Sequence, residues 1–321
     1  MKTIGILFGG DAINQNKSIT RAINLYDNIN KSKYEIVMIY VDIYNNLYTG
    51  EDLKDIKSYK DAQNITGLEE VTFTKCDDKY VLLKKNGLFR QKPREIDLIF
   101  PVTYDDYKLI SSFDYLGIPI VGNKTEGALL SNDKIIRNDI LRANKINIPY
   151  YTWFYSEEYL NKKEKVLEDI EGFEYPLSIQ PAHINNVKAV CENYDDVLDS
   201  VDEMVNLDDK IIVIKELDYK DKVSIAIYKN KSKLVCSNIC TLKNDKFEVV
   251  DTQYKDKLIN NAVKAYEVLN LRGVKRFDYV ISDDEYTLIN ISNLPSNFAY
   301  SLFDNEDYRG MIENLISEEL D

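Results

Sequence analysis

The chain has 321 residues, of which 41 are Lys or Arg and 54 are Asp or Glu, so the net charge is −13 with the single His neutral. It is 44% hydrophobic and 30% charged, which excludes collagen-like, low-complexity and intrinsically disordered proteins. At roughly 100–200 residues per domain, the length predicts two or three packed units. We expect neither nucleic acid nor an anionic membrane as a main partner, because phosphate-rich surfaces are bound by clustered Lys and Arg.

The cysteines and the N-terminal residues predict a cytoplasmic protein. The four Cys form no Cys-x-x-Cys pair and one His cannot anchor a zinc site, so we expect free thiols in a reducing compartment. The apolar run at 4–9 is too short, and too soon followed by Asp11, for a signal peptide. Because no apolar run approaches the roughly 20 residues that span a bilayer, we expect a soluble, cytoplasmic chain.

Strand and helix patterns alternate in the first third of the chain. Gly9-Gly10 closes the first apolar run as a turn. Apolar runs predict buried strands at 3–8, 34–41, 96–102 and 118–121, and helical spacing of apolar residues predicts helices at 19–26 and 107–116. Strand–helix–strand alternation with short connections predicts a parallel sheet, in a unit that ends near Gly122.

The remaining two thirds of the chain predict lobes in which strands and helices are mixed. The expected helices are 126–144, 195–205, 258–269 and 304–320. The expected strands are 150–155, 175–179 and 187–191, then 210–217 and 222–228 as antiparallel neighbours, then a hairpin of 274–281 and 286–291. This pattern predicts α+β lobes after an α/β start.

Six short segments follow one another in a characteristic order. They are Ile6 to Gly10 with Ser18 eight residues later, Tyr115 to Gly122, Ser131-Asn132-Asp133-Lys134, Tyr175 to Ala182, Arg276-Phe277-Asp278-Tyr279 and Tyr286 to Pro295. In this order they resemble the D-alanine–D-alanine ligases, members of the ATP-grasp superfamily, and the likeness covers nearly the whole chain. The resemblance implies an α/β N-terminal domain with a parallel sheet at 1–122, a central lobe at 123–214 and a C-terminal lobe at 215–321.

The same resemblance implies a two-step reaction with ATP and Mg²⁺ gripped between the two later lobes. The carboxylate of one D-amino acid takes the γ-phosphoryl group of ATP, and the amine of a second amino acid attacks the acyl phosphate. Such a site needs anionic oxygen ligands for Mg²⁺. It also needs cations and backbone N–H groups for the phosphates.

The metal-binding positions are only partly kept. Asp278 fits the family's Asp, whereas Asn290 stands where the family has Glu and Ser292 where it has Asn. Asp278 and Asn290 are therefore the candidate metal ligands, and a two-Mg²⁺ cluster is hard to hold with one carboxylate. The alternative is that Asp278 is a half-exposed strand carboxylate paired with Arg276, the candidate catalytic residue for the phosphate or acyl group.

The nucleotide positions are also altered. Lys134 matches one of two family lysines, with a solvated residue in a first helical turn as the alternative, while Gln180 replaces the other lysine. Glu216 remains from a Glu-Glu pair on the adenine side. The family's Gly-Ser-Ser loop is replaced at 183–187 by His183, Ile184, Asn185, Asn186 and Val187, in which Asn185-Asn186 predicts an ordinary turn. His183 is more readily a chance loop histidine than a catalytic base.

The substrate side keeps Ser18 as a second candidate catalytic residue and loses other family positions. Asn14 stands where the family uses Glu for an ammonium group, and the glycine-rich turn of the family becomes 103–107, which has no glycine. Replacements thus concentrate at polar active-site positions while framework residues such as Gly9 and Pro176 persist.

Three hypotheses follow. The first is a pseudo-ligase that binds a small molecule or a protein and acts near cell-wall precursor synthesis, as a homodimer through the N-terminal domain or a heterodimer with an active ligase. The second is an active ATP-dependent carboxylate–amine ligase with rebuilt ligands for nucleotide and metal. The third is an interaction protein whose 24 Tyr and acidic surface bind a partner through the old cleft.

Overall fold

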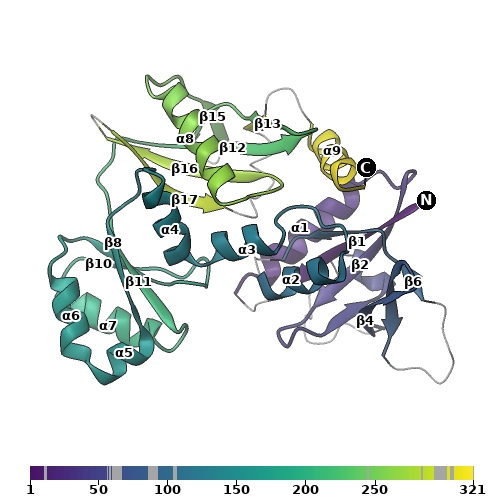
Figure 1. Cartoon of the computed structure of the whole chain (residues 1–321), viewed down its shortest axis with the longest axis horizontal. Coiled ribbons are helices and arrows are strands. Elements are labelled where there is room, and N and C mark those ends of the chain that lie inside the picture. The colour runs from purple at the N-terminus through teal and green to yellow at the C-terminus, as the bar shows by residue number, and fades with distance from the viewer. Residues whose placement is uncertain are drawn as a thin grey trace.

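The computed structural model describes three sheets with helices packed on them (Figure 1). The described residues are 1–10, 13–55, 57, 59, 67–85, 93–103, 107–243, 246–282, 285–292, 302–303 and 307–320. Residues 104–106 of the family-like stretch at 103–107 and residues 283–284 within the predicted hairpin lie outside these ranges. So do residues 304–306 of the predicted last helix and the end of the last family-like segment beyond Ser292. The expected α/β unit followed by two α+β lobes is confirmed, whereas the divisions after 122 and 214 stay predictions.

The first sheet has seven strands in the order β6-β5-β4-β3-β2-β1-β7. Their bounds are β1 (Lys2–Gly9), β2 (Tyr34–Val41), β3 (Leu47–Thr49), β4 (Glu69–Cys76), β5 (Lys79–Lys84), β6 (Arg94–Glu95) and β7 (Leu98–Pro101). β1 pairs in parallel with β2 and β7, as predicted, but β2 to β6 form an antiparallel extension that the sequence did not predict. The strand expected at 118–121 is a single parallel bridge between Ile99 and Ile120.

Helices cover both faces of β1 in this sheet. Ile4, Ile6 and Phe8 point to a face shared with α1 (Gln15–Asn28) and the C-terminal helix α9 (Tyr308–Leu320), which lie side by side in Figure 1. Leu7 belongs to the opposite face, with α2 (Tyr107–Leu116). Full burial of each such side chain contributes about 1.5–3 kcal/mol, so this unit holds the end of the chain as well as its start.

The helix expected at 126–144 is two helices, α3 (Thr125–Asn132) and α4 (Lys134–Ala143). Asp133 between them has extended backbone angles, and its carboxylate accepts hydrogen bonds from the backbone N–H groups of Ile135 and Ile136. This is an N-cap, which satisfies donors that a helix start leaves unpaired. The break places Asp133 and Lys134 together at the start of α4.

The second sheet is antiparallel, in the order β10-β9-β11-β8. Its strands are β8 (Tyr151–Tyr155), β9 (Leu177–Pro181), β10 (Ala189–Cys191) and β11 (Lys210–Lys215). One face is covered by α5 (Ser156–Asn161), α6 (Lys163–Glu171) and α7 (Tyr194–Met204). On the other face, Ile135 of α4 packs with Ala182 and Ile212, so the start of α4 lies against the ends of β9 and β11.

The third sheet has the order β15-β14-β12-β16-β17, with β13 paired to β12. Its strands are β12 (Asp221–Asn230), β13 (Lys233–Cys236), β14 (Cys240–Lys243), β15 (Lys246–Val249), β16 (Lys275–Ile281) and β17 (Tyr286–Ser292), with α8 (Lys255–Val268) packed on it. The predicted hairpin of β16 and β17 is confirmed. The predicted pairing of 210–217 with 222–228 is wrong, because the chain leaves the second sheet after β11 and enters the third at β12.

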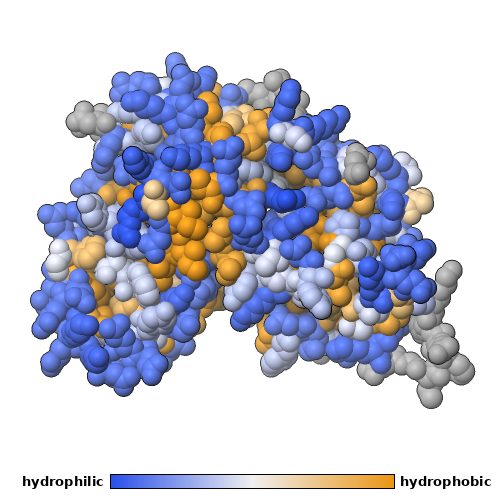
Figure 2. Space-filling view, in the orientation of Figure 1, coloured by the Kyte–Doolittle hydropathy of each residue, from blue (hydrophilic) through white to orange (hydrophobic). Residues whose placement is uncertain are grey.

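The surface is mainly polar. Figure 2 shows hydrophilic residues over most of the face drawn, with apolar residues gathered near its middle in the region of α4. None of the helices in the described ranges is both long enough and apolar enough to cross a membrane.

Gly9 ends β1 with φ of +101°, and a Cβ atom there would lie 2.2 Å from the carbonyl oxygen of Val41. Gly9→Ala should therefore reduce the free energy of unfolding by about 2–4 kcal/mol, through strain and overlap with the backbone of β2. Urea denaturation followed by circular dichroism measures the loss.

Gly172 gives the matched control, because its φ is −70° and a Cβ atom there would meet nothing within 4 Å. Gly172→Ala should change the free energy of unfolding by no more than about 0.5 kcal/mol. Equal losses for the two variants would contradict the account of the turn after β1.

Candidate functional site

The carboxylate of Asp278 is surrounded by donors of its own chain. Asp278 lies on β16 and is 4% exposed. Oδ1 accepts hydrogen bonds from Arg276 Nε at 2.8 Å and Ser224 Oγ at 2.7 Å. Oδ2 accepts from Arg276 Nη2 at 3.0 Å and Asn290 Nδ2 at 2.8 Å. A carboxylate has about four lone-pair sites, so these four donors use its capacity.

The local structure of three strands explains this arrangement. Arg276 and Asp278 are two residues apart on β16, so their side chains leave the same face of the sheet. Ser224 of β12 and Asn290 of β17 are directly opposite Asp278 in register, and Ser292 is opposite Arg276. The ion pair considered from the sequence is present, but Asp278 is buried and not half-exposed, because both neighbouring strands cover it.

Lys134 is buried against the end of β9. Its Nζ donates to the carbonyl oxygens of Pro181 at 2.6 Å and Ile184 at 2.7 Å, and the residue is 7% exposed. Burial, with the nearby charge of Arg137, lowers the pKa of Lys134 to about 7. The alternative that Lys134 is a solvated residue is therefore wrong.

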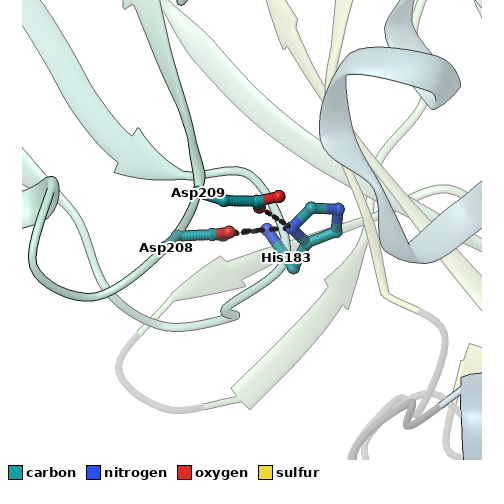
Figure 3. Close-up of side chains that lie close together, drawn as sticks. All are labelled: His183, Asp208 and Asp209. Carbon is teal, nitrogen blue, oxygen red and sulfur yellow. Dashed lines mark hydrogen bonds and ion pairs between the residues drawn. The ribbon is translucent and has the colours of Figure 1, made fainter. Parts of the chain in front are cut away.

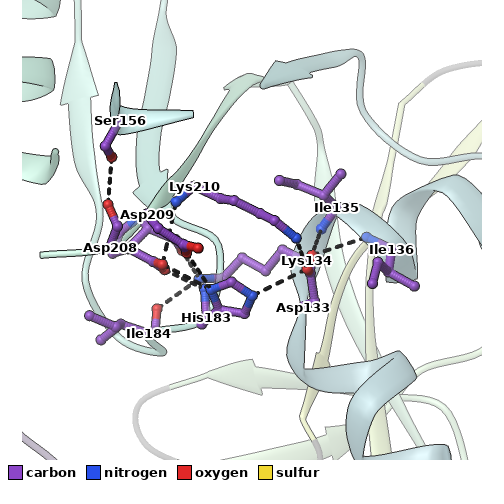
Figure 4. Close-up of polar contacts among 11 residues, drawn as sticks. Asp133, Lys134, Ile135, Ile136, Ser156, His183, Ile184, Asp208, Asp209 and Lys210 are labelled. Carbon is purple, nitrogen blue, oxygen red and sulfur yellow. Dashed lines mark hydrogen bonds and ion pairs between the residues drawn. The ribbon is translucent and has the colours of Figure 1, made fainter. Parts of the chain in front are cut away.

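His183 joins two buried carboxylates. Its Nδ1 lies 2.8 Å from Asp208 Oδ1 and its Nε2 lies 3.2 Å from Asp133 Oδ2, while its backbone N–H donates to Asp208 Oδ2 at 2.7 Å. Lys210 Nζ also donates to Asp133 Oδ2, at 2.8 Å. Figure 4 shows these side chains converging from the start of α4, the loop after β9 and the start of β11.

The electrostatics of this group favour a protonated imidazole. Hydrogen bonds to Asp133 and Asp208 raise the pKa of His183 to about 9. Burial alone would raise the pKa of Asp208, but its hydrogen bonds with His183 lower it to about 2. For Asp133, too, burial is outweighed by hydrogen bonds from His183 and Lys210, so its pKa lies well below the usual range. His183 is thus an ion-pair partner of Asp133 and Asp208 and not a free loop histidine.

His183, Asp208 and Asp209 place one nitrogen and two carboxylate oxygens within 4.8 Å of one another (Figure 3). A metal ion would take the Nδ1 lone pair, which requires an unprotonated nitrogen. Here Nδ1 faces two carboxylates, with Asp209 Oδ1 at 3.5 Å, and the raised pKa of the ring keeps its proton in place. The imidazolium itself is the cation of this cluster.

The loop at 183–187 is also fixed to the first unit. Asn186 has φ of +65°, as the predicted turn requires, and its Nδ2 donates to Asn14 Oδ1 at 2.8 Å. Asn14 is 2% exposed. The resemblance places Asn186 in the family's phosphate loop and Asn14 at its substrate ammonium site. Two residues expected to contact ligands are therefore hydrogen-bonded to each other.

The remaining candidates also have protein partners. Gln180 Nε2 donates to Ser178 Oγ at 3.1 Å, and Glu216 forms an ion pair with Lys188. Ser18 is fully buried, accepting a hydrogen bond from the Gly9 N–H at 2.9 Å and donating to the Val102 carbonyl at 2.8 Å. The catalytic and binding roles of these residues stay predictions.

Asp208 and Lys210 were not predicted from the sequence as members of this site. The available signals were Asp208-Asp209 just before an apolar strand and Asp133 at a helix start. Neither signal links them to His183, because the contacts span 25 residues for Asp208 and 50 for Asp133. The pattern of one strand or helix carries no information on such distant pairs.

The protonation of His183 gives a pH-dependent contribution to stability. The pKa in the fold, about 9, lies above the ordinary value of 6.5, so the contribution is complete below pH 6.5 and is lost as the pH rises to about 9. His183→Gln should therefore lower the free energy of unfolding more at pH 6 than at pH 9.5. The lost charge should account for a difference of roughly 1–3 kcal/mol between the two pH values. Urea denaturation of both proteins at the two pH values measures this difference.

The titration of Lys134 changes the free energy of unfolding in the opposite sense. Its pKa falls from 10.5 to about 7, so between these values the unfolded chain binds the additional proton and stability rises with pH. Lys134 is present in both the original chain and His183→Gln, so the difference in stability between these two proteins contains only the contribution of His183. Because the chain has a single His, the titration of its ring-proton NMR signal is a direct check, and a midpoint near 6.5 would contradict the network.

Comparisons with known proteins agree with the fold and the order of the segments. The family model for the D-ala D-ala ligase C-terminus matches residues 140–316, more than half of the chain. A D-alanine–D-alanine ligase from Staphylococcus epidermidis is 24% identical over 333 residues, covering 95% of this chain and 89% of that protein. The structure of a D-alanine–D-alanine ligase from Helicobacter pylori matches with a TM-score of 0.83 at 20% identity, covering 99% of this chain and 98% of that one.

A D-alanine–D-alanine ligase from Bacillus anthracis, solved in complex with ATP, matches with a TM-score of 0.70 at 20% identity, covering 100% of this chain and 97% of that one. These likenesses extend over the three sheets and their helices. The chain therefore belongs to the D-alanine–D-alanine ligase family and has its ATP-grasp fold.

Proposed function

We propose that this member of the family has lost ATP-dependent ligation and uses the inherited fold to bind a small molecule or a protein partner. The observation that carries the proposal is the closed hydrogen-bond set of Asp278. A Mg²⁺ ion needs carboxylate oxygens that point to it with free lone pairs. Asp278 instead receives four donors, two of them from the positive charge of Arg276, so the residues present do not fit the metal.

The nucleotide positions support the same conclusion. Lys134 already donates to two carbonyl oxygens, and Gln180 supplies no charge for a phosphate. Loss of one charge-assisted hydrogen bond costs roughly 1.5–3 kcal/mol, which is about 10- to 150-fold in affinity. His183 and Asn186 also tie the 183–187 loop to other segments, whereas a phosphate loop needs backbone N–H groups that are open to the ligand.

The partners of such a protein belong to the same proposal. The chain would form a homodimer through its N-terminal unit or a heterodimer with an active ligase. Either form would keep subunit association although ATP-dependent ligation is lost. A role near cell-wall precursor synthesis is supported only by membership of the family. A net charge of −13 favours basic partners over acidic surfaces.

A second candidate function is an active D-alanine–D-alanine ligase, or a related carboxylate–amine ligase, with rebuilt ligands. It is favoured by the retention of Lys134, Arg276 and Asp278 and by relatives that carry that name along most of their length. For this candidate, Arg276 would have to leave Asp278 when metal binds. Such a change exposes a buried carboxylate that is now fully paired.

The two candidates differ in turnover. The purified chain with D-alanine, ATP and Mg²⁺ should release no ADP beyond a D-alanine-free blank, because the metal and phosphate contacts are already occupied by protein groups. A coupled ADP-release assay, with a D-alanine–D-alanine ligase such as that of Staphylococcus epidermidis as positive control, measures this. D-Alanine-dependent ADP release at a rate comparable with the control would overturn the proposal in favour of the second candidate.

A double variant tests the physical cause. Gln180→Lys with Asn290→Glu adds a cation on β9 and a second carboxylate opposite Asp278, and should strengthen binding of Mg²⁺ and ATP about 10-fold or more. Gln180→Met with Asn290→Gln is the size-matched control without the new charges. Equilibrium dialysis with labelled ATP measures nucleotide binding by both double variants. Equal binding by the two would show that these positions do not limit nucleotide binding.

A further inference from the structure

A cavity of about 410 Å³ lies where four segments of the chain meet, away from the Asp278 and His183 clusters. It is formed by the end of the first unit at Gly122, the end of α8 with the segment after it, the β12–β13 hairpin and α9. Its lining residues are Val121, Gly122, Lys229, Ser232, Leu234, Tyr266, Glu267, Asn270, Leu271, Arg272, Gly273, Leu315, Glu318 and Glu319. A volume near 400 Å³ falls in the range of small-molecule sites.

The walls of this cavity are fixed by hydrogen bonds and one close contact. The backbone N–H of Arg272 donates to Asn123 Oδ1 at 2.9 Å, and Tyr266 Oη donates to the Gly273 carbonyl at 3.0 Å. Gly273 has φ of +69°, and a Cβ atom there would lie 3.0 Å from the Cα of Gly122. The cavity is therefore a formed feature of the fold, because its walls do not depend on a ligand for their position.

Five charged residues line the cavity, namely Lys229, Glu267, Arg272, Glu318 and Glu319. Two of them have opposite charge and are not paired. Among the described residues, the carboxylate of Glu319 and the guanidinium of Arg272 have no hydrogen-bond partner and no ion pair, with each other or with any other side chain. Burial raises the pKa of Glu319, and the positive charges of Arg272 and Lys124 reduce that effect without cancelling it. Glu319 is thus partly dehydrated without a compensating donor, a state that a bound cation would relieve.

The lining of the cavity also has an apolar part. Leu234, Leu271 and Leu315 line the same cavity. We propose that the cavity binds a small zwitterion, an amino acid or a short peptide, with its ammonium group at Glu319, its carboxylate at Arg272 and its aliphatic part against the three leucines. Arg is suited to this role, because its planar guanidinium matches a carboxylate with two parallel hydrogen bonds.

The test uses L-alanyl-L-alanine as the probe and the full-length chain labelled with ¹⁵N. The backbone amide signals of Gly122 and Gly273 should shift on titration, because both residues line the cavity. N-Acetyl-L-alanyl-L-alanine, which lacks the ammonium group, and L-alanyl-L-alanine amide, which lacks the carboxylate, should each bind at least about 10-fold more weakly. Site-resolved signals separate this cavity from the Asp278 and His183 clusters, so the outcome does not depend on the ligation assay.

Two variants and one control complete the test. Glu319→Gln and Arg272→Gln should each weaken binding of the probe about 10-fold or more. Glu168→Gln, the same kind of substitution at an exposed position of α6, should leave binding unchanged. The proposal is overturned by an absence of shifts at Gly122 and Gly273 with saturating probe. It is also overturned by equal affinity for the blocked dipeptides, or by unchanged affinity in both cavity variants.

Discussion

A buried carboxylate must be compensated, and in this protein the compensation comes from the chain itself. Taking an ion out of water costs several kcal/mol, which is recovered only with close partners of good geometry. Asp278, Asp133 and Asp208 are all buried or nearly so and are balanced by Arg276, Lys210 and His183. Asp278 is therefore a structural contact among neighbouring strands of the third sheet, whereas Asp133 and Asp208 join separate segments of the molecule.

These contacts connect segments that are far apart in the chain. Asp133 caps α4 and binds Lys210 across 77 residues, and Asn186 reaches Asn14 across 172 residues. The 183–187 loop is thus tied to the central sheet, to α4 and to the first unit at once. A segment held in this way opens rarely, since opening must break several buried polar contacts together.

The sequence predicted those elements whose apolar pattern is local. The strand at 34–41 and the helix at 107–116 have the expected bounds, and the opposition of Asp278 and Asn290 follows from the hairpin of β16 and β17. The break at Asp133 escaped prediction because apolar residues continue at helical spacing on both sides of it. The separation of β11 from β12 and the environment of His183 depend on tertiary contacts, which no local period encodes.

We propose that the polar groups around Asp278, Lys134 and His183 are satisfied by the protein itself and therefore do not bind Mg²⁺ and ATP. Thermal unfolding of the chain with and without millimolar ATP and Mg²⁺ tests it most directly, because a ligand at 100 times its dissociation constant adds about 2.7 kcal/mol of stability. For domains of this size that is a rise of a few degrees. We expect no Mg²⁺-dependent rise, and a rise of several degrees that requires both ATP and Mg²⁺ would contradict the account.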